Sequence, residues 1–278
     1  MSATLRIDGA TRLYAIVGDP IVQVRSPLVF TERFAERGAN AVLLPVRIAP
    51  ERFDDVFAAL LAIGNLDGVL VTVPFKPRAL RFADRLGATA QCIGALNALR
   101  REDDGSWSGD MFDGVGFVRA AERKGQRIRD RRVALLGAGG AGSAIACALA
   151  EAGAATIDVI DPAPGRADAL AGKLRAAFPD CRFAAATSVA SDADLIVNAS
   201  TVGMRPGDGM PAPLGPLPPG TLVGDVILSE EPTAMLRHAE RCGCAWVSGR
   251  DMHAGQSDAI VAFFAPVLER AGGRPAAS

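Results

Sequence analysis

The chain lacks long hydrophobic runs, blocks of like charge and an abundance of aromatic residues, which make up only 5% of its 278 residues. No apolar run approaches the roughly 18 residues that a membrane-spanning helix needs, so we expect no membrane partner. The 30 basic and 31 acidic residues nearly cancel and form no long block of one sign, so we expect no nucleic-acid partner. Charged residues near the N-terminus interrupt any signal-peptide centre, which predicts a cytoplasmic protein.

The cysteines give no sign of a disulfide framework or a metal site. Their number, five, is odd, and no CxxC spacing repeats. His238, Cys242 and Cys244 stand close together in sequence, as zinc ligands often do. No fourth ligand is identifiable, and the segment is typical of the end of an amphipathic helix. We therefore predict that the protein holds no metal.

Hydrophobic residues make up 49% of the chain, enough for two cores of moderate size. In the first half, strand and helix patterns alternate, which is typical of a parallel sheet. The expected strands cover residues 13–17, 41–46 and 68–73, and the expected helices begin near Pro27 and Pro50.

A second alternation of strands and helices begins at Arg132. It predicts strands at 132–136, 155–160, 182–185, 194–198 and 221–226, with helices at 140–153, 164–178 and 232–242. We expect a helix at 113–124 to lead into it and a long helix at 251–271 to follow it. The predicted fold is α/β, with a substrate domain at 1–112, a Rossmann-type domain at 113–249, and the last helix, within 250–278, packing back on the first domain.

The glycine-rich segment after residue 136 has the spacing of a dinucleotide-binding turn. Gly137 allows a tight turn, Gly139 lets a pyrophosphate approach the backbone, and Gly142 lets helix and strand pack closely. Asp161 ends the next strand, where such folds place the carboxylate that binds the adenosine ribose. The alternative is a glycine-rich turn in an ordinary α/β domain.

Several short sequences occur in an order that resembles the shikimate dehydrogenase family, which includes quinate/shikimate dehydrogenases. The resemblance extends from Gly18 to Gln256, and the string VTVPFK is its most specific part. The matching segments are 18–21, 25–27, 71–76, 109–110, 113–116, 137–142, 198–201 and 249–256.

The resemblance implies reversible hydride transfer between a nicotinamide dinucleotide and a ring hydroxyl of shikimate, quinate or a related cyclic hydroxy acid. It implies that Lys76 and Asp113 are catalytic. The implied substrate ligands are Ser26, Thr72, Asn97 and Gln256. The implied dinucleotide ligands are the glycines of the turn and three polar residues: Gly137, Gly139, Gly140, Gly142, Asp161, Asn198 and Ser200.

Lys76 is placed by its sequence at the carboxyl edge of a parallel strand, where such folds bind ligands. Free lysine has a pKa of about 10.4, so its ammonium can donate a proton during carbonyl reduction. Only the neutral amine can accept a proton during oxidation, so we expect the oxidation rate to rise from pH 7 to about 9 or 10. The alternatives are a solvated loop lysine at Lys76 and a helix N-cap at Asp113, a role that is compatible with catalysis.

The substrate segments depart from the family pattern toward apolar residues. Where the family usually has polar side chains, this chain has Val24, Leu70, Ala98, Met111, Phe112 and Leu228. A hydrogen bond to a charged group contributes about 1.5–3 kcal/mol. The same chemistry on a less polar substrate is therefore an alternative, as is a catalytically idle dinucleotide sensor. His253 is either a packing residue or a new pocket contact.

The residues after the second dinucleotide strand also depart from the family pattern. NADP-dependent members typically have Asn-Arg-Thr there, whereas this chain has Asp161-Pro162-Ala163. A carboxylate binds the ribose hydroxyls of NAD and repels a 2′-phosphate. We therefore predict that NAD is preferred, while Arg166 leaves NADP possible. The expected state is a monomer or a homodimer.

Overall fold

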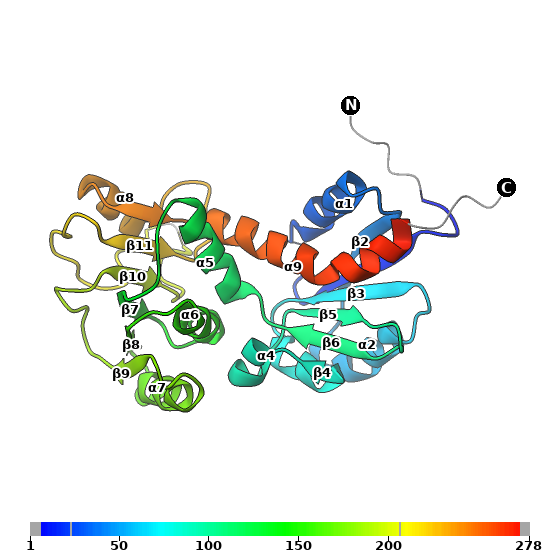
Figure 1. Ribbon diagram of the computed structural model, residues 1–278, viewed down its shortest axis with the longest axis horizontal. Coiled ribbons are helices and arrows are strands. Elements are labelled where there is room, and N and C mark those ends of the chain that lie inside the picture. Colours follow the sequence, from blue (N-terminus) through cyan, green and yellow to red (C-terminus); the bar gives the residue numbers. More distant parts are fainter. Residues whose placement is uncertain (1–6, 23, 206, 273–278) are drawn as a thin grey trace. The chain divides into compact units, whose positions relative to one another are not determined.

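The computed structural model describes residues 7–22, 24–205 and 207–272. Residues up to Phe112 together with those from Ala259 onward form a first compact unit, and Asp113–Asp258 form a second (Figure 1). The predicted first domain and last helix also include residues 1–6 and 273–278, which lie outside the described residues. The substrate-binding role predicted for the first domain and the dinucleotide-binding role predicted for the second stay predictions.

The first unit contains a mixed sheet of six strands in the order β2-β1-β3-β5-β6-β4. The strands are β1 (Arg12–Gly18), β2 (Ala41–Arg47), β3 (Leu66–Val71), β4 (Arg85–Leu86), β5 (Ala98–Arg101) and β6 (Trp107–Asp110). Strand β1 pairs in parallel with β2 and β3, whereas β5 runs antiparallel to both β3 and β6. The sequence predicts the three parallel strands but not β4, β5 and β6. Strand β4 has only two residues, and β5 (ALRR) and β6 (WSGD) contain no apolar run.

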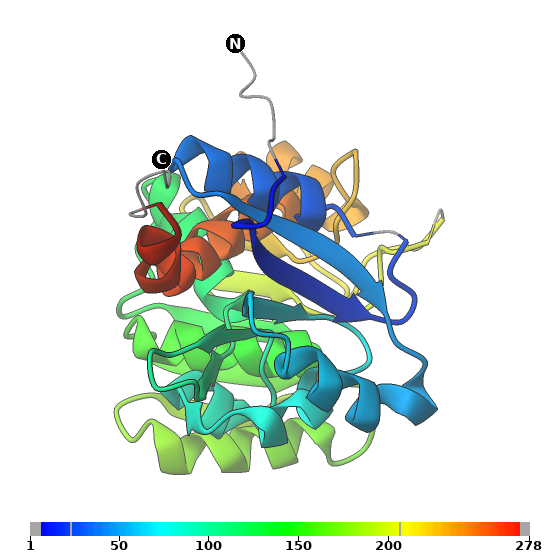
Figure 2. The same cartoon turned by 90° about the vertical axis from the view of Figure 1, so that its right-hand side faces the viewer.

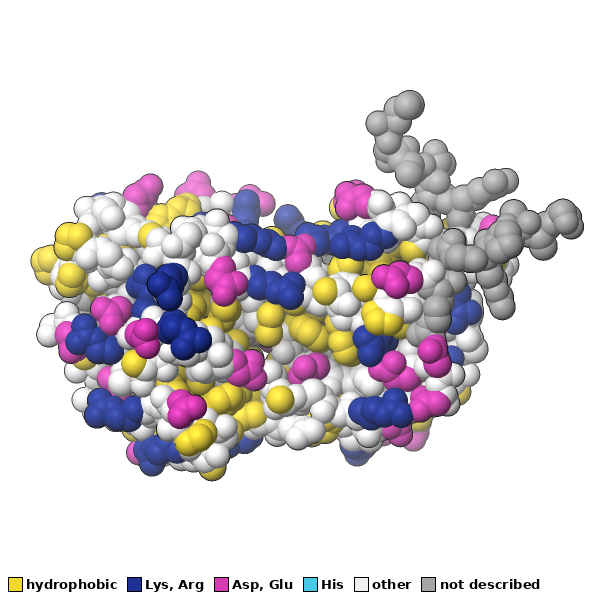
Figure 3. Space-filling view, viewed as in Figure 1, with side chains coloured by type: hydrophobic (Ala, Val, Ile, Leu, Met, Phe, Trp, Pro, Cys, Tyr) yellow, Lys and Arg dark blue, Asp and Glu magenta, His cyan; other side chains and the backbone are white. Residues whose placement is uncertain are grey.

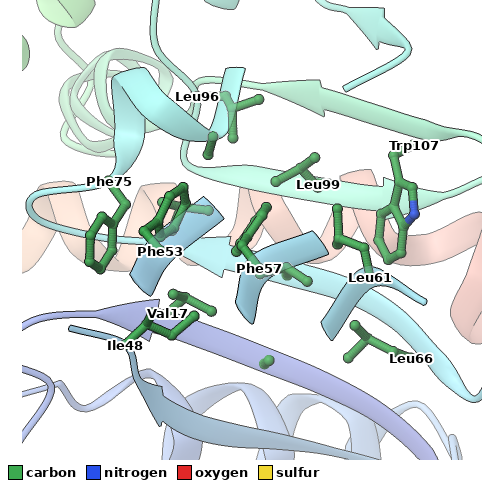
Figure 4. Close-up of a cluster of buried hydrophobic side chains, with 14 of the residues drawn as sticks. Val17, Ile48, Phe53, Phe57, Leu61, Leu66, Phe75, Leu96, Leu99 and Trp107 are labelled. Atoms are coloured by element: carbon green, nitrogen blue, oxygen red, sulfur yellow. The ribbon is translucent and has the colours of Figure 1, made fainter. Parts of the chain in front are cut away.

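Helices cover both faces of this sheet. They are α1 (Ser26–Glu36), α2 (Phe53–Leu61), α3 (Lys76–Ala79), α4 (Ala88–Ile93) and part of α9 (Gly249–Gly272), with 3₁₀ turns η1 (Pro50–Arg52) and η2 (Leu80–Phe82). In Figures 1 and 2, α1 and α9 lie on one side of the sheet and α2 on the other. On the α2 side, Phe53, Phe57 and Phe75 lie together in a buried cluster (Figure 4).

The second unit contains a wholly parallel sheet of six strands in the order β12-β11-β10-β7-β8-β9. Its strands are β7 (Arg132–Leu136), β8 (Thr156–Ile160), β9 (Arg182–Ala185), β10 (Leu195–Asn198), β11 (Leu222–Asp225) and β12 (Ala245–Val247). Its helices are α5 (Asp113–Arg123), α6 (Gly140–Glu151), α7 (Arg166–Ala177), α8 (Ala234–Arg241) and the first part of α9. The predicted α/β class with a Rossmann-type sheet is confirmed.

Helix α9 belongs to both units, because the division falls between residues 258 and 259. Its later residues Ile260, Phe264 and Leu268 share a buried cluster with Tyr14 and Phe34 of the first unit. The ring of Tyr14 packs against those of Phe34 and Phe264, at centroid distances of 4.6 and 5.0 Å. The last helix therefore completes the core of the first unit.

The surface agrees with the balanced composition. On the face that Figure 3 shows, basic and acidic side chains are interspersed over each unit. Within the described residues, no helix is both long enough and apolar enough to cross a membrane.

Candidate functional site

A tight glycine turn joins β7 to α6 in the second unit. Gly137 has a φ of +104°, a conformation that residues with a Cβ rarely adopt. A Cβ on Gly142 would overlap the carbonyl oxygen of Gly137, so helix and turn approach more closely than alanine allows. Gly139 is the N-cap of α6 and offers no side chain to the first turn. The backbone N–H groups and the positive end of the helix dipole are thus suited to bind a phosphate.

Asp161 lies directly beside this turn. Its carboxylate accepts hydrogen bonds from the backbone N–H groups of Ala138 (2.8 Å) and Ala163 (2.9 Å). Burial opposes ionisation of the Asp161 carboxyl, but these two amides and the charge of Arg166 hold its pKa below the ordinary value. The carboxylate is therefore ionised at neutral pH and fixes the turn as well as facing it.

Arg166 supplies a cation at the same place. It is the first residue of α7, and its side chain is 54% exposed. One guanidinium nitrogen lies 3.8 Å from Asp161, and another would lie 3.6 Å from a Cβ on Gly139. A positive and a negative group thus stand together beside the predicted dinucleotide turn.

Asn198 and Ser200 lie in a hydrogen-bonded network rather than on an open surface. The Asn198 side chain is fully buried, donating to the Val202 carbonyl (2.9 Å) and to Asp225 Oδ1 (3.0 Å). Its Oδ1 accepts from both the N–H (3.1 Å) and the hydroxyl (2.7 Å) of Ser200. Asp225 also accepts from the hydroxyl of Thr233 at 2.6 Å. The structure thus brings Asn198 and Ser200, two predicted dinucleotide ligands, together in one hydrogen-bonded network.

Asp225 is a residue that the sequence analysis missed. It ends β11 directly opposite Asn198 at the end of β10, and its side chain is buried. Burial raises the pKa of its carboxyl, although Thr233, Ile227 and Asn198 donate hydrogen bonds to it. The available signal was an acidic residue that ends an apolar strand of a parallel sheet.

Lys76 begins α3 in the first unit, and the surrounding structure holds that short helix firmly. The carbonyl oxygen of Lys76 accepts a hydrogen bond of 3.1 Å from the Leu96 amide. Arg78 of α3 pairs with Asp54 at 3.0 Å, and the ring of Phe75 stacks on that of Phe53 at 4.2 Å. The backbone that carries the Lys76 ammonium is therefore well fixed.

Thr72 and Asn97 lie at the same edge of the first sheet. Thr72 follows β3, and its amide donates to the Val17 carbonyl at the end of β1. Asn97 is 3% exposed, and its side-chain oxygen accepts from the Phe112 amide at 3.0 Å. Ser26 is buried as the first residue of α1. The strand ends and helix starts of this unit thus position three of the four predicted substrate ligands.

The fourth, Gln256, contacts Asp113 within the second unit. Gln256 Nε2 donates a hydrogen bond of 2.6 Å to Asp113 Oδ1 at the start of α5. A Cβ on Gly116 would lie 2.8 Å from the Cβ of Gln256, and one on Gly255 would overlap the carbonyl oxygen of Gly116. Two glycines thus let α5 and α9 approach closely enough for this hydrogen bond, which holds the buried Asp113 carboxylate in one orientation.

An apolar rim accompanies the polar residues of the first unit. Val24, Phe112 and Phe263 are partly buried and pack against a cluster that contains the buried Leu70. The rings of Phe112 and Phe263 lie 5.1 Å apart. Val24, Leu70 and Phe112, at which the sequence departs from the family pattern toward apolar residues, therefore lie together.

The segment that contains His238, Cys242 and Cys244 contacts the loop at Gly215. His238 Nε2 lies 2.9 Å from the Gly215 carbonyl oxygen and 3.7 Å from the Cys242 sulfur. Across the described residues, no three His, Cys, Asp or Glu side chains are grouped so that they could hold a metal ion.

Comparison with known families gives two matches. The shikimate dehydrogenase substrate binding domain matches residues 16–99, and the ThiF family matches residues 115–163. A shikimate dehydrogenase (NADP(+)) of Rubrobacter xylanophilus is 37% identical over 254 residues, which cover 89% of this chain and 88% of the relative.

Solved structures resemble the chain over nearly its whole length. A shikimate 5-dehydrogenase of Listeria monocytogenes, in complex with shikimate and NAD, is 27% identical with a TM-score of 0.86 and covers 97% of this chain and 98% of its own. A quinate dehydrogenase of Corynebacterium glutamicum, in complex with NAD, is 25% identical with a TM-score of 0.83, at coverages of 94% and 97%.

Proposed function

The chain belongs to the shikimate dehydrogenase family, and on that premise we propose which of its residues bind and which react. It is an oxidoreductase that exchanges hydride reversibly between a nicotinamide dinucleotide and a ring hydroxyl of shikimate, quinate or a related cyclic hydroxy acid. Turnover that is lost in Lys76→Ala would exclude the alternative of a catalytically idle dinucleotide sensor.

Lys76 and Asp113 are the proposed catalytic pair. A nicotinamide dinucleotide bound at the glycine turn would supply the acceptor or donor of the hydride. In reduction, the Lys76 ammonium donates a proton to the oxygen that gains charge, and in oxidation the neutral amine accepts the hydroxyl proton. Asp113 orients the reacting hydroxyl, while Ser26, Thr72, Asn97 and Gln256 bind the remaining polar groups of the ring. The strongest support for the role of Asp113 is the 2.6 Å hydrogen bond from Gln256, which fixes the Asp113 carboxylate.

Kinetics of Lys76→Ala and Asp113→Asn test these roles. With shikimate and quinate, each assayed with NAD and NADP, we expect kcat to fall about 10²- to 10⁴-fold, the usual contribution of a general acid–base group. Dinucleotide affinity should persist in both variants. Lys173→Ala, on the exposed surface of α7, is the matched lysine control. Unchanged kcat in Lys76→Ala would refute the assignment.

The glycine turn with the start of α6 is the proposed dinucleotide site, with Gly137, Gly139, Gly140 and Gly142 supplying close backbone contact. Asn198 and Ser200 shape the neighbouring loop. The curated relatives are named for NADP(+), so they favour NADP and do not support a preference for NAD.

The local chemistry is the reason to propose NAD all the same. The buried, ionised Asp161 faces the turn and would repel a 2′-phosphate, while the exposed Arg166 offers that phosphate a partner. We propose that NAD is preferred and NADP is also used. Measured kcat/KM values for the two dinucleotides decide the matter, and a clear preference for NADP would overturn the proposal.

The apolar rim favours a second candidate, the same reaction on a less hydroxylated ring. Placing a substrate hydroxyl against Val24 or Phe112 without a hydrogen bond costs about 1–3 kcal/mol. A panel of cyclic hydroxy acids that differ by one hydroxyl would test this candidate. Efficient turnover of shikimate at low KM would exclude it.

A further inference from the structure

Asp225 is a buried carboxylate without a countercharge. The residue is 1% exposed, and among the described residues no charged group acts on it. Its partners are the neutral donors Asn198 Nδ2 (3.0 Å), Ile227 N–H (3.1 Å) and Thr233 Oγ1 (2.6 Å). Such a carboxylate costs stability, so its contribution has to be sought in the segments that it holds.

One of these segments is the loop after β10. Asn198 links Asp225 to the N–H and hydroxyl of Ser200. A Cβ on Gly137 would lie 2.9 Å from backbone atoms of Ala199 and Ser200. Asp225 therefore fixes, through Asn198, the backbone that packs against the dinucleotide turn.

The other segments follow β11. The Ile227 amide is bound directly, and a Cβ on Gly249, the first residue of α9, would overlap the Ile227 carbonyl oxygen. Thr233, the N-cap of α8, donates its hydroxyl to the second carboxylate oxygen. The strand end at Asp225 thus anchors the loop beside the turn, the start of α8 and the backbone on which α9 begins.

We propose that Asp225 is a positioning residue for dinucleotide binding. Its oxygens hold the 199–202 loop against the glycine turn and hold Ile227 against the start of α9. The role needs acceptor oxygens and not a negative charge, because every donor is neutral and Oδ1 alone already accepts from both Asn198 and Ile227. The proposal rests on the second unit being the dinucleotide-binding unit.

Three variants separate this role from simple stability. Asp225→Ala removes every acceptor, Asp225→Asn keeps Oδ1 and offers an N–H to Thr233, and Asn198→Ala breaks only the arm toward the turn. The matched control is Asp194→Asn, which weakens an ion pair with Arg132 at the opposite end of the same sheet. Each is measured for NAD and NADP dissociation constants by calorimetry, for KM of the hydroxy acid, and for thermal midpoint.

We expect Asp225→Ala and Asn198→Ala to raise the dinucleotide Kd about tenfold or more, as loss of a buried acceptor does. In Asn198→Ala the KM of the hydroxy acid should change much less than the dinucleotide Kd. Asp225→Asn should recover most of the affinity lost in Asp225→Ala, with a thermal midpoint no lower than that of the wild type.

Other results would overturn the proposal. Wild-type affinity in folded Asp225→Ala or Asn198→Ala would exclude the positioning role, and so would an equal loss in Asp194→Asn. If Asp225→Ala does not fold, Asn198→Ala still decides. A loss in Asp225→Asn as large as in Asp225→Ala would assign the effect to charge and refute the acceptor role. Absence of dinucleotide binding in the wild-type protein would instead refute the proposed function.

Discussion

The carboxyl edges of the two sheets differ in the chemical groups that form them. In the second unit, the edge consists of backbone amides, closely packed glycines and the buried network around Asp225. In the first unit, it carries individual side chains, Thr72, Lys76 and Asn97, and Asn97 accepts a hydrogen bond from Phe112 of the apolar rim. One edge is specified by backbone geometry and the other by side-chain identity.

This difference explains why the edge of the second unit is easier to predict from the sequence than the edge of the first unit. A pyrophosphate is the same in every dinucleotide and is bound by backbone N–H groups at a helix start, so the glycine spacing has little freedom. A ring with several hydroxyls is bound by separate side chains, each of which can be replaced without disturbing the sheet. The edge that is proposed to bind the dinucleotide can thus persist while the edge that is proposed to bind the ring changes.

The largest expected effect comes from adding one methyl group to the backbone-built edge. In Gly142→Ala the new Cβ would overlap the Gly137 carbonyl oxygen, and such overpacking costs about 1–3 kcal/mol. We expect the free energy of unfolding to fall by that amount and dinucleotide affinity to fall by up to about a hundredfold. Urea unfolding and calorimetric titration measure the two.

The matched control for this variant is Gly172→Ala. Gly172 lies on the exposed face of α7, and a Cβ there would meet open space, so alanine should stabilise the protein by about 0.5–1 kcal/mol. If Gly142→Ala behaves like this control, the backbone description of the second unit's edge is wrong.

A smaller effect should follow from restoring a polar group to the first unit's edge. Val24 is partly buried at the rim, two residues before Ser26. A hydroxyl there can donate to a substrate carboxylate, a bond of about 1.5–3 kcal/mol, so Val24→Ser should raise kcat/KM for shikimate about tenfold. Val22→Ser is the control, because Val22 is 92% exposed. Equal changes in both variants would contradict a local effect.

The smallest expected effect is a change of stability with pH, which has opposite signs for two carboxylates of the second unit. The pKa of Asp225 is raised by burial, whereas that of Asp161 is lowered, because two backbone amides and Arg166 outweigh its burial. Ionised Asp161 thus stabilises the fold, and this stabilisation is lost as the pH falls through its folded-state pKa. Ionised Asp225 costs stability, and this cost disappears as the pH falls through its own.

Urea unfolding of the wild type, Asp161→Asn and Asp225→Asn from pH 7 down to about pH 2.5 tests the two signs, because the loss of stability for Asp161 falls below its ordinary pKa of about 3.9. The unfolding free energy of the wild type should decrease relative to Asp161→Asn and increase relative to Asp225→Asn. Shifts in one common direction would show that the two carboxylates do not differ as described.

The sequence predicted elements whose pattern is local and long enough to be periodic. The strands β1, β3 and β7 and the glycine turn are of this kind. Strand β4 has two residues, and no pattern of that length separates a strand from a loop. The family and the reaction were predicted correctly from short motifs, while the preference for NAD is not supported by the relatives' names.

Contacts between distant residues were beyond sequence reasoning. Asp113 and Gln256 are 143 residues apart, and Asp225 is joined to Asn198 across 27 residues. Asp225 has no motif of its own, because its role depends on the register of two strands and on a threonine that caps the next helix. Only the folded arrangement identifies it.

The shared helix α9 has a consequence for how the protein is made. The second unit, Asp113–Asp258, is one continuous stretch of chain, whereas the first unit needs Ile260, Phe264 and Leu268 to fill its core. During synthesis from the N-terminus, β1–β6 leave the ribosome before the α9 residues that share their core, so this core is complete only once α9 has been made. Lys76, the proposed catalytic lysine, is thus translated before the helix that completes the core of its unit.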